Sequence, residues 1–275
     1  MFQSYMGASD LPAKIVTLTT DFGLRDPYVA EMKAVVLSIC PDAVIVDVTL
    51  EVEKFNIRMG AYVLASAAPY FSKGTIHVVV VDPGVGTRRR SLLIQTQQGF
   101  FVGPDNGVLL LAAEKQGITS VHEVTNRKLM LPHISNTFHG RDIFAPSAAH
   151  LANGMLAADF GPEIRDVVKP EFAKVTFGNG TLKGEILYVD GFGNLITNIS
   201  KEDLENLRIE ASIKVELTNS KMNLKLGKTY AETQLRETIA LVGSHGYVEI
   251  AVNQGSAAEE FKAKLGDKIL LSSRS

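Results

Sequence analysis

The run Thr75–Val81 (TIHVVVV) constrains the fold of this chain more than any other segment. A strand with one face in water alternates apolar and polar residues, whereas this run is apolar at successive positions. Such runs are typical of strands covered on both faces, as the strands of parallel sheets are. The run therefore predicts a buried strand in a sheet covered on both sides.

The segments around this run alternate between strand and helix patterns. Ile15–Thr20 and Ala43–Val48 have the β-branched character of buried strands. Apolar residues at a spacing of three to four predict helices, and these cover Tyr28–Cys40, Phe55–Ala68, Gly107–Gln116 and Asp142–Asn153. Strands that alternate with helices of about 12 residues predict a layered α/β domain with a mainly parallel sheet.

The pattern changes after Pro170, where little helical periodicity remains. Phe177–Thr181 (FGNGT) is interpreted as a turn-rich link. Short β runs follow at Gly184–Val189, Ile213–Leu217, Ile239–Val242, Tyr247–Val252 and Lys268–Leu271. Short strands at close intervals predict a small all-β barrel or sandwich. We therefore expect two domains, α/β over 13–172 and all-β over 180–275.

Charge and composition exclude several classes of function. The 275 residues carry 28 Lys and Arg against 30 Asp and Glu, with no basic stripe, so we expect no nucleic-acid partner. Apolar runs fall far short of the roughly 20 residues of a membrane helix, and residues 1–12 lack the apolar core of a signal peptide. Cys40 is the single cysteine, which excludes an internal disulfide. We expect a cytoplasmic protein without membrane contact.

Polar clusters follow two of the predicted strands, at the edge where open α/β sheets usually place their sites. Asp21, in TTDFG after the first strand, either accepts hydrogen bonds from a pair of sugar hydroxyls or caps the next turn. Asp82 ends the strongest strand and opens VDPGVGTRRR over 81–90. The three arginines of that segment form either a solvated hairpin edge or, for one of them, an ion pair that fixes Asp82 in a site.

Other polar clusters precede a helix or lie between β runs. His139, in TFHGRD, is followed by glycine and a helix start, a setting that can present an imidazole to a cleft. Pro104–Gly107 (PDNG) is interpreted as a turn. In the C-terminal part, Asp190–Asn194 and Gly243–Gly246 have the composition of hairpin turns, and their spacing alone leaves their function open.

Together these segments resemble the motif set of the S-adenosyl-L-methionine hydroxide adenosyltransferases (adenosylmethionine hydrolases), a family related to the fluorinase and chlorinase that attack the same substrate with halide. The resemblance runs from about Ile15 to Leu271, with the motifs in the same order. The matching motifs are TTDFG at 19–23, VDPGVGTRRR at 81–90, PDNG at 104–107, TFHGRDIFAP at 137–146, DGFGNLITNI at 190–199 and GSHGYVEIA at 243–251. Six motifs in order make the resemblance highly specific.

The resemblance implies an Asp–Arg–His set that activates water, made of Asp82, Arg89 and His139. Arg88 and Arg90 adjoin Arg89, so the sequence alone leaves open which of the three is the site arginine. The halogenases have a tyrosine where Asp82 stands and a halide-contacting serine where Gly140 stands. This chain differs from them at both positions, so the resemblance implies attack by water, which hydrolyses S-adenosyl-L-methionine to adenosine and L-methionine.

Substrate contacts are implied in the same way. Asp21 binds the ribose hydroxyls, Phe55 flanks the ribose, and Asn194 contacts adenine. Asp190 contacts the methionine portion, and Ser244 lies near the methionine carboxylate, with His245 where the halogenases have an arginine. Glu249 and Val252 line the adenine pocket. The family resemblance also implies a homotrimer whose sites lie between the α/β domain of one subunit and the β domain of the next.

The leaving group of this reaction is a neutral thioether, so we expect no metal and no cofactor. Two alternatives remain at the level of sequence. One is metal-dependent hydrolysis on carboxylates that converge on Mg²⁺ or Mn²⁺, with Asp21, Asp82, Asp105 and Asp142 as candidates. The other is a non-catalytic sensor of adenosine or S-adenosyl-L-methionine, which has no need of a water-activating set.

Overall fold

The structure is a computed structural model that describes residues 14–207, 211–218 and 220–273. Contacts divide the chain into two compact units, with the division between Val168 and Lys169. The first unit is a layered α/β domain and the second is built mainly of β-strands, as the sequence predicts. Each unit is described by itself.

A six-stranded sheet in the order β2-β1-β3-β5-β4-β6 forms the centre of the first unit. Its strands are β1 (Ile15–Thr20), β2 (Val44–Thr49), β3 (Ile76–Val80), β4 (Ser91–Thr96), β5 (Phe100–Pro104) and β6 (Ile118–Glu123). β1 pairs in parallel with β2 and β3, and β3 pairs in parallel with β5. β4 runs antiparallel to both of its neighbours, so the sheet is mainly parallel.

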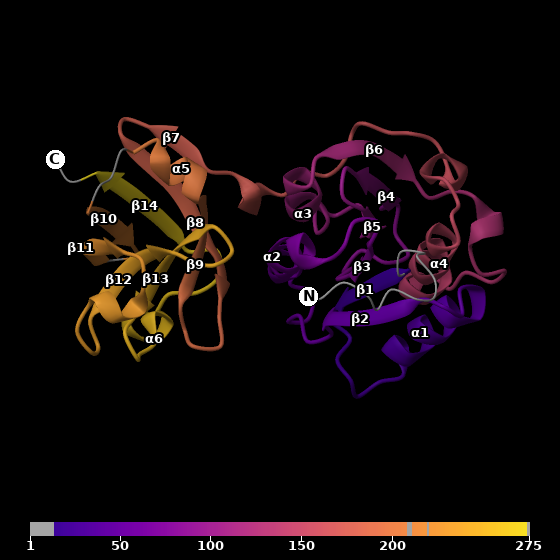
Figure 1. Ribbon diagram of the computed structural model, residues 1–275, viewed down its shortest axis with the longest axis horizontal. Coiled ribbons are helices and arrows are strands. Elements are labelled where there is room, and N and C mark those ends of the chain that lie inside the picture. The colour runs from indigo at the N-terminus through magenta and orange to yellow at the C-terminus, as the bar shows by residue number, and fades with distance from the viewer. Residues whose placement is uncertain (1–13, 208–210, 219, 274–275) are drawn as a thin grey trace, which may run out of the picture. The chain divides into compact units, whose positions relative to one another are not determined.

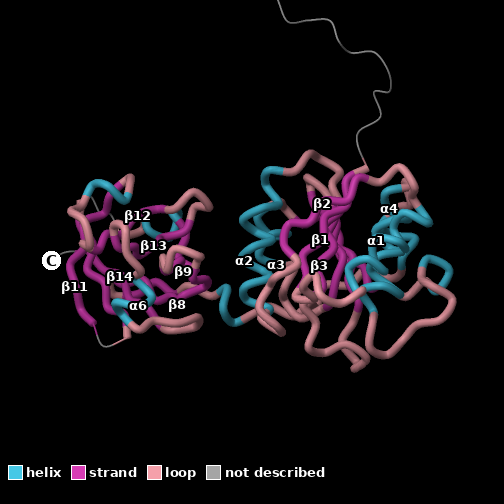
Figure 2. Tube along the Cα trace, turned by 90° about the horizontal axis from the view of Figure 1, so that it is seen from below, coloured by secondary structure: helices cyan, strands magenta, loops and turns pink. Residues whose placement is uncertain are grey.

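Helices cover both faces of this sheet, as Figures 1 and 2 show. They are α1 (Tyr28–Ile39), α2 (Ile57–Ala67), α3 (Leu110–Lys115) and α4 (Ala145–Ala152). α1 and α4 lie against one face and α2 and α3 against the other. All five residues of β3 are buried, because alternate side chains meet a helical layer on each side. The interpretation of Thr75–Val81 as a doubly covered strand is confirmed.

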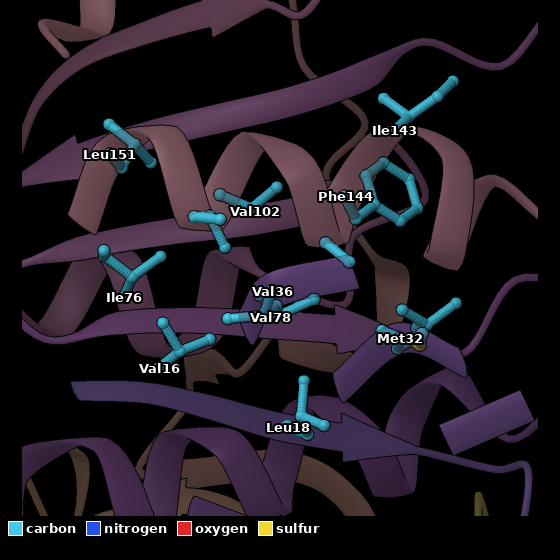
Figure 3. Packing of buried hydrophobic residues seen from close by; sticks show 14 of the residues in the cluster. Val16, Leu18, Met32, Val36, Ile76, Val78, Val102, Ile143, Phe144 and Leu151 are labelled. Carbon is cyan, nitrogen blue, oxygen red and sulfur yellow. The ribbon is translucent and has the colours of Figure 1, made fainter. Parts of the chain in front are cut away.

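The larger core of the unit lies between the sheet and the α1–α4 layer (Figure 3). Val16 and Leu18 of β1 and Val78 of β3 face α1, whose Met32 and Val36 are fully buried. Those two helix residues are four positions apart, which places them on one face of the helix. The apolar periodicity that predicts this helix therefore also identifies the face that it buries.

The helix predicted from Asp142 begins differently. Gly140–Phe144 forms a π-helical turn, and α4 continues from Ala145 with Pro146 in its first turn. Pro146 cannot donate to the carbonyl of Asp142, four residues earlier, and that carbonyl instead accepts from the backbone N–H of Leu131. π-helical turns are rare and are frequent at functional sites.

The second unit is a closed β-barrel. Its strands are β7 (Thr176–Gly178), β8 (Thr181–Val189), β9 (Leu195–Ser200), β10 (Ser212–Leu217), β11 (Ser220–Gly227), β12 (Thr238–Val242), β13 (Tyr247–Val252) and β14 (Lys268–Ser273). The sheet order is β14-β10-β11-β12-β13-β9-β8-β7, and the pairing of β14 with β8 closes it. Two short helices, α5 (Lys201–Glu205) and α6 (Ala257–Phe261), complete the unit. Among the described strands, short β7 is appended outside the closed ring through its pairing with β8.

The interpretation of Phe177–Thr181 as a link is wrong. Phe177 pairs with Leu182, and Gly178 pairs with Thr181, so the segment is a two-residue hairpin within the barrel unit. Asn179 and Gly180 both have positive φ, as this kind of turn requires. A turn-rich composition is common to links and hairpins, and only the pairing of the flanking residues separates them.

Among the described residues, no helix combines the length and the apolar character needed to cross a membrane.

Candidate active site

A cavity of about 550 Å³ opens at the edge of the sheet where β1 and β3 end. Thr20 of β1 is in register with Val80 of β3, so Asp21 and Asp82, which follow the two strands, come to the same edge. The residues that line the cavity are Asp21, Phe22, Asp26, Tyr28, Glu31, Lys54, Phe55, Val80, Asp82, Val85, Ser135, Thr137, Phe138, His139, Gly140 and Arg141. Four of the predicted site residues, Asp21, Phe55, Asp82 and His139, therefore face one space.

Asp82 and Arg89 form a buried ion pair at the wall of this cavity. Nε of Arg89 lies 3.0 Å from both carboxylate oxygens of Asp82, and Nη2 lies 2.5 Å from Oδ2. The two side chains are only 4% and 9% exposed. Arg89 also donates to the carbonyl of Arg90 and the hydroxyl of Ser91. The carboxylate is thus held in one orientation by a guanidinium that is itself fixed.

Arg89 is also the arginine that reaches His139. Its Nη2 lies 2.9 Å from Nδ1 of the imidazole. A guanidinium has donors only, so Nδ1 accepts and the single proton of the neutral ring is on Nε2. Burial, followed by the charge of Arg89, lowers the pKa of His139 below its ordinary value. The neutral form of the imidazole is therefore favoured in this contact.

The other two arginines of the segment have different positions. Arg88 is exposed. Arg90 bonds to the carboxylates of Asp105 and Asp166. The reading of all three arginines as a solvated hairpin edge is therefore wrong for Arg89 and Arg90, because each of them binds a carboxylate.

The turn that carries Asp82 packs closely against the segment that carries His139. Gly86 has a φ of 76°, and a Cβ at this position would lie 2.2 Å from the carbonyl oxygen of Asn136. That separation is far below van der Waals contact, so only glycine fits without movement of the backbone. Gly86 therefore lets Arg89 and His139 approach from two distant segments.

Asp21 is held by the loop that precedes α2. The backbone N–H of Phe55 donates to Oδ2 of Asp21 at 2.8 Å, and Nζ of Lys54 donates to the Asp21 carbonyl. Phe55 has a φ of 64°, an uncommon conformation for an aromatic residue, and its side chain is 68% exposed. The strained backbone at Phe55 thus both orients Asp21 and presents a ring at the cavity.

Three further aromatic side chains line the cavity without having been singled out from the sequence. The rings of Phe22, Tyr28 and Phe138 pack against one another with centroid separations of 5.2–5.7 Å. Phe22 directly follows Asp21, and Phe138 directly precedes His139. Their positions next to candidate site residues could have identified them from the sequence. They give the cavity an apolar wall beside its charged side chains, which favours a substrate with a planar or apolar part.

A second cavity, of about 580 Å³, lies in the barrel unit. Its lining includes Asp190, Asn194 and Val252 of the predicted set, together with Phe192, Tyr230, Asn253, Gln254 and Gly255. Asp190 and Asn194 lie in the turn between β8 and β9, as predicted. The carboxylate of Asp190 accepts from the backbone N–H groups of Phe192 and Asn194 and from the Asn194 side chain, each at 2.9 Å. It therefore closes its own turn in addition to facing the cavity.

The remaining predicted residues of this unit differ in position. Ser244 is exposed in the β12–β13 turn, outside the lining of the cavity. Glu249 is buried on β13, and its Oε1 accepts from the Tyr230 hydroxyl at 2.8 Å. Burial raises the pKa of Glu249, while the Tyr230 hydrogen bond partly opposes this shift. Tyr230 connects Glu249 to the cavity, and no local sequence pattern marked it.

The four carboxylates of the metal-site hypothesis do not converge. Asp82, Asp105 and Asp142 are bonded to Arg89, Arg90 and Arg141 respectively. Among the residues that the structure describes, no group of three or more His, Cys, Asp and Glu side chains is placed to hold a metal ion. A carboxylate bonded to arginine already has a fixed cationic partner, so these three carboxylates do not form the predicted metal site.

Comparison with protein families gives the same division of the chain. The family model of the SAM hydroxide adenosyltransferase N-terminal domain matches residues 16–161. The model of the corresponding C-terminal domain matches residues 184–270. The two matches together cover most of the chain.

Individual relatives span nearly the whole chain. An (R)-S-adenosyl-L-methionine hydrolase of Salinispora tropica is 38% identical over 272 residues, 94% of this chain and 97% of the relative. A fluorinase of Actinoplanes sp. is 30% identical over 92% of this chain and 95% of its own length. The crystal structure of an uncharacterized conserved protein from Thermotoga maritima superposes with a TM-score of 0.86 at 38% identity, covering 94% of this chain and all of that one. The chain therefore belongs to the SAM hydroxide adenosyltransferase family.

Proposed function

We infer that the protein hydrolyses S-adenosyl-L-methionine to adenosine and L-methionine. The oxygen of water attacks ribose C5′, the bond between C5′ and the sulfonium sulfur breaks, and its electron pair stays on sulfur. The thioether that leaves is neutral and needs no proton. The proton that water loses is taken by a group of the protein. We propose that neither a metal ion nor a cofactor takes part, because the neutral leaving group needs no Lewis acid and Asp82 stands at the cavity as an acceptor for the water proton.

The contact between Arg89 and His139 supports a specific division of roles. Because Nδ1 of His139 accepts from Arg89, the other ring nitrogen carries the proton and is a donor. Asp82 keeps lone pairs beyond those bonded to Arg89, so it is the proposed acceptor of the water proton. The guanidinium and the imidazole N–H stabilise the developing hydroxide in a partly dry cavity.

Water is preferred over halide as the nucleophile for two reasons. Asp82 supplies a proton acceptor that a halide does not require. Gly140 stands where the halogenases have serine, and a Cβ at this position would lie 3.2 Å from Sδ of Met32 and 3.3 Å from the Phe138 ring. Both contacts are tighter than ordinary van der Waals contact, so the wall beside His139 has little room for a halide-binding side chain.

The substrate contacts are proposed as the family resemblance implies. In the first unit, Asp21 binds the ribose hydroxyls with Oδ1, since Oδ2 accepts from Phe55, whose ring flanks the ribose. In the second unit, Asn194 contacts adenine, and Glu249 and Val252 line the adenine pocket. Asp190 and Ser244 contact the methionine portion.

The single observation that carries the proposal is the buried contact of Arg89 with both Asp82 and His139 at one cavity. Its test is incubation of the purified protein with S-adenosyl-L-methionine, with and without a chelator, followed by chromatographic separation of the products. We expect equal release of adenosine and methionine in both samples. Binding of adenosine without turnover would support the sensor instead, and activity lost with chelator and restored by metal would support the metal-dependent hydrolase.

We also propose that the enzyme is a cytoplasmic homotrimer with each active site between neighbouring subunits. The division of the expected contacts between two cavities, one in each unit, supports this. Asp82→Ala and Asn194→Ala, each of low activity alone, should regain activity when denatured and refolded together, because some mixed sites then contain two intact halves. Sites formed within one subunit would give no recovery, and light scattering of the native protein checks the trimer mass.

A further inference from the structure

One continuous segment, 135–141, forms the wall of the first cavity that carries His139. Ser135, Thr137, Phe138, His139, Gly140 and Arg141 all line the cavity. Asp142 follows this segment directly, is completely buried, and is not used in the mechanism above. A buried carboxylate is costly unless its oxygens are bonded, so its partners indicate what it holds in place.

The carboxylate of Asp142 is bonded to both ends of the segment. The backbone N–H of Ser135 donates to Oδ2 at 2.7 Å. From the other end, Nε of Arg141 donates to Oδ1 at 2.7 Å and Nη2 donates to Oδ2 at 3.3 Å. The backbone N–H of Asp142 also donates to the carbonyl of Phe138. The segment is thereby closed into a loop, with His139 on the π-helical side of it.

Arg141 extends this network to α1. Its Nη1 donates to Oε2 of Glu31 at 2.8 Å, and its guanidinium lies 5.0 Å from the centre of the Phe138 ring. The bonds to Asp142 and Glu31 raise the pKa of Arg141 above its ordinary value, so its charge is constant. The guanidinium therefore connects Phe138, the residue immediately before His139, to helix α1.

Arg89 contacts the His139 ring directly, and the charges of Asp82 and Asp142 also affect the pKa of the ring. Arg89 and Asp82 both belong to the connection between β3 and β4, whereas Asp142 directly follows the segment that carries His139. The bond between Nη2 of Arg89 and Nδ1 of His139 joins two segments 50 residues apart. This bond requires both segments to be held in place, and Asp142 holds the segment that carries His139.

We propose that Asp142, together with Arg141, is a positioning residue that holds the His139 imidazole against Arg89 and so sets the rate of turnover. This inference rests on the proposed hydrolase function. Asp142 and Arg141 act through His139, not on the reacting atoms. A displacement of about 1 Å in a positioned group can lower a rate roughly 10²-fold.

The test is the variant Asp142→Asn. The amide of asparagine places an NH₂ group against one of two donors, either the Ser135 N–H or Nε of Arg141. The hydrogen bond at that end of the segment is therefore lost. We expect kcat for adenosine release to fall by about 10–10²-fold. Affinity for adenosine, which Asp21 and Phe55 contact from other segments, should be retained. Nitrogen NMR of the imidazole should change from one tautomer to a mixture.

A double-mutant cycle separates positioning from a general loss of stability. If Asp142 acts through His139, Asp142→Asn should have little further effect on kcat in a His139→Ala background. An equal loss in both backgrounds would overturn the proposal, as would a wild-type kcat in the single variant. A wild-type protein that releases no adenosine would instead contradict the hydrolase function.

Glu31→Gln repeats the test on a side chain that is 36% exposed, so folding is not at risk. It weakens the outer anchor of Arg141, because the amide oxygen that remains is an uncharged acceptor, and we expect a smaller loss of kcat that also disappears without His139. Asp47→Asn is the matched control, because it removes the negative charge that pairs with another α1 side chain, Lys33, from strand β2 and outside the 135–141 segment. Equal kcat losses in Glu31→Gln and Asp47→Asn would overturn the proposal.

Discussion

Nη2 of Arg89 lies 2.9 Å from Nδ1 of His139 while the same guanidinium binds both carboxylate oxygens of Asp82. One planar side chain thus orients an acid and an imidazole that come from different segments. The rigid fork of a guanidinium makes this possible, because its five donors point in fixed directions.

Arg89→Lys should lower kcat by about 10²-fold although the charge is kept. An ammonium group is a single point donor and cannot bind Asp82 at two atoms and reach His139 as well. Adenosine release by purified variants measures the effect. Arg88→Lys is the matched control, because Arg88 is exposed, and it should keep the wild-type rate. Equal rates for the two variants would contradict the role of Arg89.

Gly86→Ala should destabilise the protein by about 1–3 kcal/mol and lower turnover. The new methyl group would meet the Asn136 carbonyl and displace the segment that carries His139. Gly74→Ala is the control, because Gly74 also has a positive φ, of 89°, but nothing lies within 4 Å of its Cβ position. Thermal unfolding and kcat should both change more in Gly86→Ala. A fall in kcat of the same size in Gly74→Ala would argue against the displacement.

Phe55→Gly should weaken substrate binding without lowering the free energy of unfolding. The ring is 68% exposed, so little apolar burial is lost, and glycine removes a left-handed strain of about 1–2 kcal/mol. Part of that gain is offset by the conformational entropy of glycine in the unfolded chain. Phe55→Ala removes the ring but keeps the strain, so the two variants should share a raised KM and differ in Tm. A KM unchanged in both would mean that the ring does not contact substrate.

His77 should make folding stability fall between pH 6.5 and about 4. Its ring is buried, stacks on Phe101 and lies 2.8 Å from the Thr17 hydroxyl, and burial lowers its pKa to about 4. As pH falls below 6.5, the unfolded chain takes up a proton that the folded chain resists, so stability present above pH 6.5 is lost. The slope approaches about 1.4 kcal/mol per pH unit, and the total is about 3 kcal/mol.

Urea unfolding from pH 7.5 to 5 measures this dependence for the wild type and for His77→Gln. The variant cannot be protonated in this range, so its stability should change less with pH even if it is lower throughout. Parallel curves for the two proteins would show that another group is responsible.

The layered α/β architecture of the first domain was predictable because its signals are local. Continuous apolar character identified β3, and apolar residues at a spacing of three to four identified α1. Burial of both faces of a strand, or of one side of a helix, follows directly from the pattern of neighbouring residues. The strands β4 to β6 were not predicted, because they are short and carry weaker patterns next to turns. In the second domain, the strands were partly predicted, but the choice between sandwich and closed barrel depends on the pairing of β14 with β8, which lie far apart in the chain.

For the site, the sequence by itself determined which chemical groups stand at the strand ends, Asp21 and Asp82 foremost, because strand ends follow from local pattern. Only the tertiary structure decided which of three adjacent arginines binds Asp82. It also decided that Gly86 packs closely against the Asn136 carbonyl and that the Asp142 carboxylate bonds to both ends of the segment that carries His139. Adjacent residues of one type have the same local pattern, and contacts between segments some 50 residues apart depend on packing. The partners of Arg89 are therefore a property of the folded chain.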